Sequence, residues 1–379
     1  MTDQAGPRRT PTAGAGPLQS PDLSQSPDLL FSLADLQAEA GRRLDPVHRD
    51  FFAGGAGDER TLRANETAFD AYRILPRVLR GGGERDLRTE LLGETLPMPV
   101  LVSPTAFHRL AHPEGEAATA RAVGAAGTVL VVSMAATTPI EAVAGTSGGP
   151  ARLWFQLYPQ PDLGFTASLI GRAEAAGCRA LVVTVDSPVF GRRERDLRNG
   201  FLDLPAGLCC ENMRDPETGR IREIVMDATL DWTRIGWLRE TTRLPIVLKG
   251  ILHPADARLA VAHGVDAVLV SNHGGRQLDG VPASIDALPA VVEAVGSRIP
   301  VLLDGGIRRG SDILTALALG AVAVGIGRPV VWGLAARGES GVRQLLDLLR
   351  ADLARAMTLA GAVRPADLTP DMIVTRVPR

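Results

Sequence analysis

The chain has 379 residues, 45% apolar and 22% charged, which is typical of a globular protein with a sizeable core. Its net charge of −2 argues against a protein that binds nucleic acid or an anionic membrane through bulk charge. Three cysteines (Cys178, Cys209 and Cys210) make no disulfide framework, which favours a reduced compartment and predicts a cytoplasmic protein.

The first segment, residues 1–30, is rich in Pro, Gly, Ser, Gln and Thr. Such a composition buries too little apolar surface to offset the entropy of ordering, so we expect a disordered leader. Arg8 and Arg9 are not followed by an apolar run, so the leader does not resemble a signal peptide. The following residues predict a helical extension, whose first helix has Ser32 as its N-cap.

After Leu96 the chain alternates short apolar runs with amphipathic stretches. The runs lack period-two alternation, which is typical of parallel strands buried on both faces. We expect eight strands, at Pro99–Ser103, Val129–Val132, Arg152–Tyr158, Ala180–Asp186, Pro245–Lys249, Ala267–Ser271, Pro300–Asp304 and Ala321–Ile326.

The amphipathic stretches between these runs predict helices at Glu114–Ala126, Leu163–Ala176, Asp256–His263, Ser284–Val295 and Gly310–Leu319, and a closing helix at Gly341–Gly361. Eight parallel strands with intervening helices predict an α/β fold, a (β/α)8 TIM barrel. A doubly wound sheet has fewer strands and an early Gly-rich turn. Residues 31–379 are therefore expected to form one barrel domain.

One connection is too long to be a simple loop. More than forty residues separate Asp186 from a helix expected near Trp232–Glu240, and they include Arg192–Arg198 and the Cys209–Cys210 pair. Long loops of compact domains are often lids or binding loops. This one leaves the carboxyl end of the fourth strand, the face on which TIM barrels carry their chemistry, so we expect a lid.

The later strands end in residues suited to catalysis and phosphate binding. Strand five ends in Lys249, the one lysine among 41 basic residues. Strands seven and eight end in the glycine- and arginine-rich segments 304–310 and 325–329. Backbone N–H groups freed by glycine, together with arginine forks, form the usual phosphate cradle of a barrel.

The loop after strand six pairs a histidine with an arginine. His273 and Arg276 are three residues apart, with two glycines between them. A guanidinium can hold a substrate carboxylate in a fork while an imidazole acts as base near the adjacent carbon. The other histidines show no metal-ligand spacing, so no metal site is expected.

These segments resemble the FMN-dependent α-hydroxy-acid oxidase/dehydrogenase family, which includes glycolate, lactate and mandelate-type enzymes. The resemblance rests on Ser-Asn-His-Gly-Gly-Arg-Gln at 271–277, on Pro-Thr-Ala at 104–106, on the glycines after the last two strands and on residues 53–62. It covers about Phe31 to Gly361, and the 271–277 string is highly specific.

The resemblance implies FMN as cofactor and a role for each matching residue. His273 would be the base, Asp186 its partner, and Lys249 the cation that stabilises the anionic reduced ring. The substrate carboxylate would be held by Arg276 and Arg193, with Tyr158 as a hydroxyl donor to the substrate. The other implied cofactor contacts are Pro104, Thr105, Ala106, Ser133, Gln156, Thr184, Ser271, Asp304, Gly305, Gly306, Arg308, Gly327 and Arg328.

The implied reaction is that of an (S)-2-hydroxy-acid oxidase, which converts a 2-hydroxy acid to the 2-oxo acid and reduces O2 to H2O2. Two departures bear on the substrate. Phe51 stands where many members have a tyrosine that bonds the substrate carboxylate, and Ala135 where plant glycolate oxidases have a bulky tryptophan. Both favour a larger, mandelate-like acid. The resemblance also implies a homotetramer.

Three alternatives stay open. The same fold and cofactor could serve a dehydrogenase with another electron acceptor, although residues 201–210 are too short an apolar segment for the membrane anchor of such enzymes. A monooxygenase that decarboxylates the bound product is a second alternative. A non-catalytic phosphate-binding barrel is the third, and it would leave Lys249, His273 and Arg276 without a joint purpose.

Overall fold

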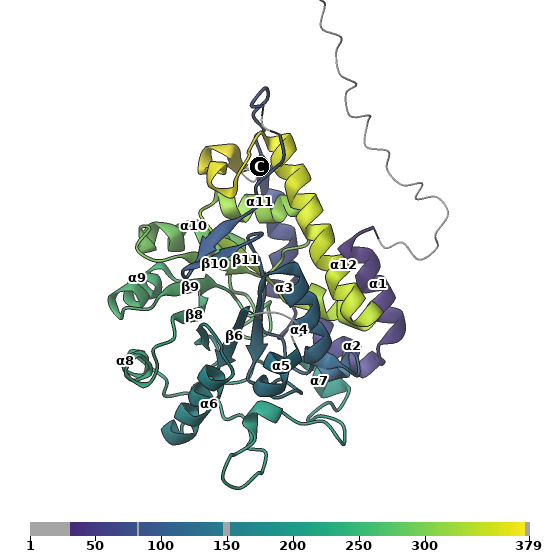
Figure 1. The fold of residues 1–379 in the computed structure, drawn as a ribbon, viewed down its shortest axis with the longest axis vertical. Helices are drawn as coiled ribbons and strands as arrows, with labels where there is room; N and C mark the ends of the chain where they lie inside the picture. Colours follow the sequence, from purple (N-terminus) through teal and green to yellow (C-terminus); the bar gives the residue numbers. More distant parts are fainter. Residues whose placement is uncertain (1–30, 82, 147–151, 376–379) are drawn as a thin grey trace, which may run out of the picture.

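The computed structural model describes residues 31–81, 83–146 and 152–375, so the expected leader lies outside the described residues. Its centre is a closed barrel of eight parallel strands in the order β10-β11-β4-β5-β6-β7-β8-β9 (Figure 1). The strands are β4 (Val100–Val102), β5 (Val129–Ser133), β6 (Arg152–Leu157), β7 (Leu181–Thr184), β8 (Ile246–Ile251), β9 (Ala267–Val270), β10 (Val301–Asp304) and β11 (Ala323–Ile326). All eight predicted strands are confirmed.

Both faces of the barrel strands are apolar, which explains why their sequences do not alternate. In β5, Val129 and Val131 belong to the inner cluster of the barrel, whereas Leu130 and Val132 pack toward the surrounding helices. The buried polar residues of these strands, such as Ser133 and Gln156, have hydrogen-bond partners, as burial of a polar group requires. The predicted end of the fifth strand was wrong, because β8 continues past Lys249 to Ile251 with an irregular register between these residues.

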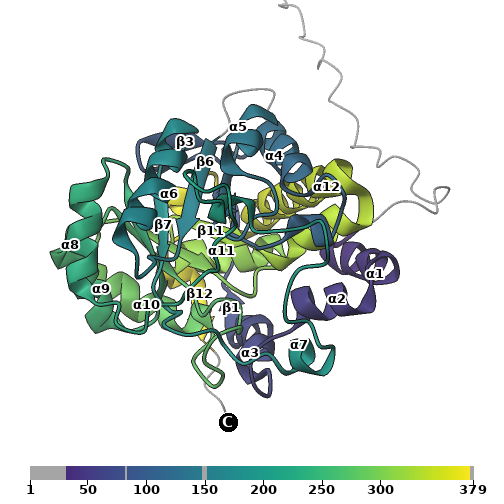
Figure 2. The same cartoon turned by 90° about the horizontal axis from the view of Figure 1, so that it is seen from below.

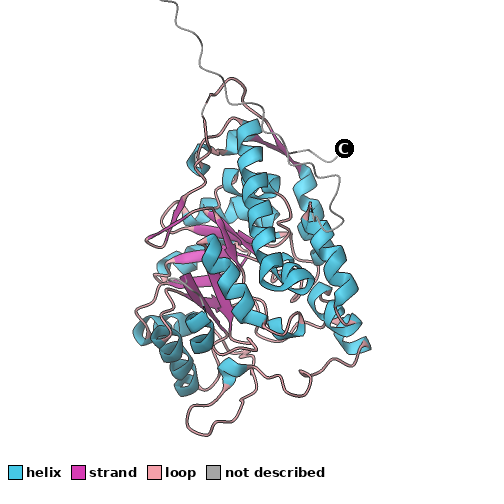
Figure 3. Ribbon diagram, turned by 45° about the vertical axis from the view of Figure 1, so that its right-hand side comes forward, coloured by secondary structure: helices cyan, strands magenta, loops and turns pink. Residues whose placement is uncertain are grey.

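Helices surround the barrel (Figure 3). The predicted helices are confirmed, with boundaries that differ by at most two residues: α4 (Gly115–Ala126), α6 (Leu163–Ala175), α8 (Trp232–Thr241), α9 (Pro254–Ala262), α10 (Ser284–Val295) and α11 (Gly310–Ala318). Two further helices were not predicted: α5 (Ile140–Thr146), and α7 (Glu194–Arg198), which lies in the segment expected to be a long loop.

The last helix begins earlier than predicted. The structure has α12 at Arg328–Ala360, with non-helical backbone at Arg337 and Gly338. Pro329 occupies the first turn, where its missing N–H costs no hydrogen bond. The predicted helix therefore corresponds to the part of α12 that follows the break.

The N-terminal extension contains α1 (Leu33–Arg43), α2 (Pro46–Ala53) and α3 (Arg60–Thr67). Ser32 is the N-cap of α1, as predicted, and its Oγ accepts a hydrogen bond of 3.2 Å from the N–H of Asp35. α1 packs along α12, which in turn covers α4. The extension thereby places α2 and α3 beside the open end of the barrel.

Short strands outside the barrel were not predicted. β1 (Tyr72–Ile74) pairs with β12 (Ile373–Thr375), and β2 (Thr89–Leu91) pairs with β3 (Glu94–Leu96). Leu91 and Leu96 join the inner cluster, so the β2–β3 hairpin closes the amino-terminal end of the barrel.

The long segment 185–231 leaves the carboxyl end of β7, as predicted for a lid. It carries α7, which contacts α2, and these elements lie side by side near α3 (Figure 2). Among the described residues, no helix is long and apolar enough to cross a membrane.

Candidate active site

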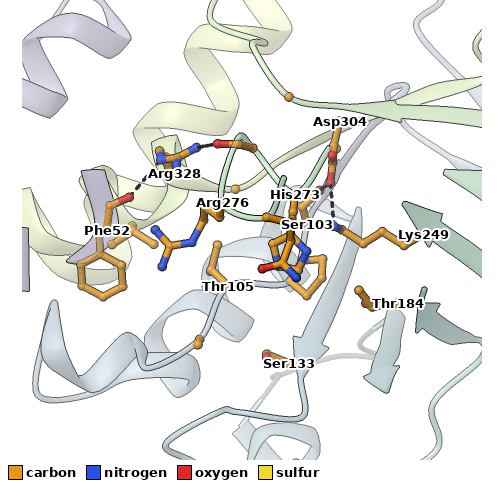
Figure 4. A pocket seen from close by; sticks show the side chains of 18 of the residues that line it. Phe52, Ser103, Thr105, Ser133, Thr184, Lys249, His273, Arg276, Asp304 and Arg328 are labelled. Atoms are coloured by element: carbon orange, nitrogen blue, oxygen red, sulfur yellow. Dashed lines mark hydrogen bonds and ion pairs between the residues drawn. The ribbon is translucent and has the colours of Figure 1, made fainter. Parts of the chain in front are cut away.

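A cavity opens at the carboxyl ends of the barrel strands and collects the predicted site residues (Figure 4). All of them line it except Asp186 and Ser271, which lie directly behind lining residues. The Asp186 carboxylate contacts His273, and the Ser271 hydroxyl contacts Lys249. Strands and loops far apart in the sequence therefore converge on one space.

The His273 ring is held by a carboxylate on one side and faces a phenol on the other. Its Nδ1 lies 2.9 Å from Oδ1 of Asp186, and its Nε2 lies 3.4 Å from the hydroxyl of Tyr158. The Ser187 hydroxyl donates to the same Asp186 oxygen at 3.0 Å. With Nδ1–H donated to Asp186, Nε2 carries the free lone pair that a base needs.

The electrostatics of this pair keep the imidazole neutral and the carboxylate charged. Burial lowers the pKa of His273, and the charge of Lys249 lowers it further, while Asp186 acts in the opposite direction. For Asp186, burial favours the neutral acid, but His273 and Lys249 outweigh it and bring the pKa to about 2. Burial, followed by the charge of Asp186, raises the pKa of Tyr158, so its phenol stays protonated.

Arg276 is anchored by backbone carbonyls. Its Nη1 donates to the carbonyls of Phe51 at 2.7 Å and Gly54 at 2.9 Å. Since these bonds use only one of its three nitrogens, the other N–H groups are available to a ligand. Burial, together with the neighbouring Arg193 and Arg328, lowers the pKa of Arg276 well below its ordinary value. Such a cluster of cations favours the binding of an anion.

Arg193 is predicted to share this role, but it has a carboxylate partner of its own. Its Nε lies 3.1 Å from Oδ2 of Asp196, which sits on α7 of the lid. Burial raises the pKa of Asp196. A substrate carboxylate would therefore compete with a counter-ion that Arg193 already has. The sequence did not predict this role of Asp196.

Phe51 forms part of an aromatic wall. Its ring stacks on Phe107 at 5.3 Å between centroids, and Phe201 packs against it at 5.1 Å. The guanidinium carbons of Arg276 and Arg193 lie 5.0 and 5.4 Å from its centroid. These distances fit cation–π contacts, so Phe51 helps to orient both arginines without offering a hydroxyl.

Further apolar groups line the same cavity. Ala135 lies in the turn that follows β5, and the lid contributes Phe190, Ile224 and Met226. The three lid residues were missed, because nothing in the long connection indicated which of its side chains face inward. Together they leave an apolar space beside the cationic cluster.

Three neighbouring strands present a chain of polar side chains to the cavity. Gln156 on β6 accepts a hydrogen bond of 3.1 Å from Ser133 on β5 and donates one of 3.2 Å to Thr184 on β7. Each is buried. The predicted grouping of Ser133, Gln156 and Thr184 along one edge is thus present in the geometry, and their cofactor contact stays a prediction.

Lys249 lies at the floor of the cavity. Its Nζ is 3.1 Å from the hydroxyl of Ser271 and 3.9 Å from Oδ2 of Asp304, as Figure 4 shows for the ion pair. Oδ2 also accepts a hydrogen bond of 3.0 Å from Ser103. The ammonium is therefore fixed in place while it keeps an N–H to donate.

The segments after β10 and β11, which were predicted to bind a phosphate, line the same cavity, and their contact with a phosphate stays a prediction. Nη2 of Arg308 lies 2.6 Å from Oε1 of Glu66 on α3. Gly305 and Gly306 adopt positive φ values of 101° and 85°. A Cβ on Gly306 would sit 1.9 Å from the carbonyl oxygen of Asn65, so only glycine fits there.

Arg328 is more occupied than expected. It donates to the carbonyls of Phe52 at 2.9 Å, Gly274 at 2.8 Å and Gly54 at 2.8 Å. Two of its five N–H groups stay available. Arg328 therefore ties α2 to the β9 loop, and its contact with a phosphate stays a prediction.

Unpartnered polar groups show that this cavity suits a flavin mononucleotide. Oδ1 of Asp304 is buried without a hydrogen-bond partner, and Lys249 retains a free donor. A planar ring with N–H and C=O groups at its edge matches this floor and the Ser133–Gln156–Thr184 chain. The Gly305–Gly306 turn with Arg308 matches a phosphate group. The residues present fit the cofactor that the sequence predicts.

Comparisons with known proteins agree with this geometry. The family model described as FMN-dependent dehydrogenase matches residues 40–375. The L-lactate oxidase of Nostoc sp. is 46% identical over 90% of this chain and 97% of its own length. The glycolate oxidase of Spinacia oleracea is 45% identical over 88% of this chain and 92% of its own length.

Solved structures share the fold. A mandelate oxidase crystallised with benzoylformic acid superposes with a TM-score of 0.85 at 43% identity, covering 92% of this chain and 99% of the other. A mandelate oxidase variant with (S)-mandelic acid gives a TM-score of 0.85 at 42% identity, covering 93% and 100% of the two chains.

Proposed function

The chain belongs to the FMN-dependent dehydrogenase family, and from this premise we propose that it is an (S)-2-hydroxy-acid oxidase. The reaction converts a 2-hydroxy acid to the 2-oxo acid, and O2 takes up the two electrons and two protons to become H2O2. The observation that carries the proposal is the His273–Asp186 pair, whose imidazole lines the same cavity as Arg276 and Lys249.

Arg276 binds and orients the substrate carboxylate. Its Nη1 is held by two backbone carbonyls, so its other N–H groups form a fork in a fixed position. Arg193 supplies a second cation once the substrate carboxylate competes with Asp196 for it. Orientation of this kind lowers the barrier because the reacting atoms no longer need to find one another.

His273 takes the proton that substrate oxidation releases. Its lowered pKa keeps Nε2 unprotonated, and Asp186 stabilises the imidazolium that forms. The Tyr158 hydroxyl, 3.4 Å from Nε2, donates to the substrate oxygen. Two routes fit the same residues, because the proton can come from the hydroxyl together with hydride transfer or from the α-carbon.

Bound FMN would supply a two-electron acceptor beside the substrate. Lys249 places a positive charge at the cavity floor, where it stabilises negative charge that develops there. Asp304 and Ser271 hold the ammonium in position. Gly305, Gly306 and Arg308 are the residues that would hold the phosphate.

We propose that the substrate is larger than glycolate and mandelate-like. The support is the apolar space next to Arg276, with Phe51 and Phe107 stacked on one side and small Ala135 in the lining. An aryl ring would bury apolar area there and gain aromatic contacts of about 0.5–1.5 kcal/mol. The mandelate oxidases with a similar fold support the same substrate class.

The experiment that tests the function is anaerobic mixing with a panel of 2-hydroxy acids. We expect mandelate to bleach the flavin and oxygen to restore the colour with release of H2O2. Bleaching that only an artificial acceptor reverses would favour the dehydrogenase. Recovery of a decarboxylated acid would favour the monooxygenase. Protein that takes up no FMN would favour the non-catalytic barrel.

The cellular setting is part of the proposal. Cys178, Cys209 and Cys210 are free thiols, which supports a reduced compartment such as the cytoplasm. The family resemblance supports a homotetramer. Sedimentation of the purified protein tests the assembly, and fractionation of cells tests the compartment.

A further inference from the structure

Two buried asparagines join α3 to the loop that carries His273. The Asn65 side chain donates to Oδ1 of Asn272 at 2.8 Å, and the Asn272 side chain donates to Oδ1 of Asn65 at 2.7 Å. The two residues are 207 positions apart in the chain, and both are at least 95% buried. This reciprocal amide pair links the N-terminal extension to the catalytic face of the barrel.

Each asparagine also organises the backbone around it. Asn272 accepts from the N–H of Gly275 at 3.2 Å and donates to the carbonyl of Pro282 at 3.0 Å. Asn65 accepts from the N–H of Ser284 at 3.3 Å. Truncating one asparagine would leave the other with unsatisfied buried amide groups, which destabilises the arrangement.

The residue that follows Asn272 is the base itself, in a constrained backbone conformation. His273 has φ of +60°, a left-handed conformation that a non-glycine residue adopts only when its surroundings hold it there. Asn272 fixes the chain before His273 and, through Gly275, the chain after it. A change at Asn65 would therefore reach the imidazole through the backbone.

We propose that Asn65 is a positioning residue, which holds the His273 loop in its catalytic conformation through the amide pair with Asn272. The inference rests on the proposed function, because it assigns Asn65 to the base of that reaction. Asn65 does not act through the substrate clamp, since Arg276 is anchored separately by the carbonyls of Phe51 and Gly54.

The separate anchoring leads to a specific kinetic signature. Asn65→Ala should lower kcat on the order of tenfold to a hundredfold, as small displacements of catalytic groups do, with little change in KM. The Kd of FMN for the apoprotein should stay close to that of the wild type. The double variant with Asn272→Ala should be no slower than Asn272→Ala alone, because residues that act as one unit are not additive.

Two further variants complete the experiment. Thr61→Val is the matched control: Thr61 lies on the same α3 and binds the same loop farther along, at Gly280 and Val281. It should lose stability but keep its kcat. Asn65→Asp keeps the size and the acceptor oxygen but loses the donor to Asn272, so it should fall between Asn65→Ala and the wild type even if Asn65→Ala folds poorly.

The outcomes separate this inference from the proposed function. A kcat for Asn65→Ala equal to that of Thr61→Val would overturn the inference, as would a KM that rises in step with the loss of kcat. A weakened Kd with kcat restored by excess FMN would make Asn65 a flavin ligand instead, and would also overturn it. Wild-type protein that takes up FMN but oxidises no 2-hydroxy acid would overturn the proposed function itself.

Discussion

Nδ1 of His273 lies 2.9 Å from Oδ1 of Asp186, in a contact between residues that are 87 positions apart. The bond joins the β9 loop to the end of β7, where the lid begins. A proton on Nδ1 satisfies this contact and leaves the lone pair of Nε2 free for the proton transfer that we propose. The charged partner then stabilises the imidazolium.

Asp186→Asn should reduce kcat by about a hundredfold to ten-thousandfold, the range typical of impaired general-base catalysis. In the wild type, kcat/KM should fall as the pH drops through the pKa of His273, which burial holds below its ordinary value, because the protonated ring cannot act as base. Asp186 raises that pKa, so in the variant this acid limb should move to lower pH. Profiles of kcat/KM against pH for both proteins check this, and a limb that moves upward would contradict it.

Lys249→Met should bind FMN but slow its anaerobic bleaching by substrate on the order of a hundredfold or more, because a preorganised countercharge is lost. Lys249→Arg should not restore the rate, since a planar guanidinium does not fit the site in which Ser271 and Asp304 hold a compact ammonium. Rapid-mixing absorbance measures both rates. Wild-type speed in Lys249→Met would refute the role of the ammonium.

Ala135→Trp should shrink the preference for mandelate over glycolate, since the indole would fill the space assigned to the aryl ring. The wild type should oxidise mandelate with a higher kcat/KM than glycolate or lactate, because an unfilled apolar void loses contacts. Steady-state H2O2 assays with the three acids measure the ratio. Ala351→Trp, at an exposed position of α12, is the control and should leave it unchanged. An unchanged ratio in Ala135→Trp would show that Ala135 does not shape the pocket.

Gly306→Ala should weaken FMN binding strongly. A Cβ there would lie 1.9 Å from the carbonyl oxygen of Asn65, so α3 or the phosphate cradle would have to shift. Gly177→Ala is the matched control, because Gly177 also has a positive φ but no atom within 4 Å of its Cβ position. Both variants should lose about 1–3 kcal/mol from backbone strain, and only Gly306→Ala should lose affinity. Fluorescence titration of the apoproteins with FMN measures this, and equal Kd values would contradict it.

The barrel was predictable because its signal is local. Each strand buries both faces, so each appears in the sequence as a short apolar run, as Val129–Ser133 does. The β2–β3 hairpin was not predicted, since its strands have only three residues each. Its turn at Leu92 and Gly93, with φ of 48° and 79°, lacks the Asn-Gly or Asp-Gly pair that signals a hairpin most strongly.

The placement of residues in the cavity was predictable where one motif holds them together, as with His273 and Arg276. Contacts between side chains that no motif links were not predictable. Nothing in the sequence indicated that Arg193 pairs with Asp196 or that Phe51 stacks on Phe107. Phe107 reaches that position through a backbone φ of +64°, which sequence patterns rarely reveal for a non-glycine residue.

The most direct test of the account is the anaerobic half-reaction of His273→Ala. The variant should retain FMN and bind a 2-hydroxy acid, because Arg276 and the phosphate cradle are unchanged, yet flavin bleaching by mandelate should slow by about a hundredfold to ten-thousandfold. Rapid-mixing absorbance of wild type and variant at saturating mandelate measures it. Bleaching at the wild-type rate would contradict the assignment of His273 as the base.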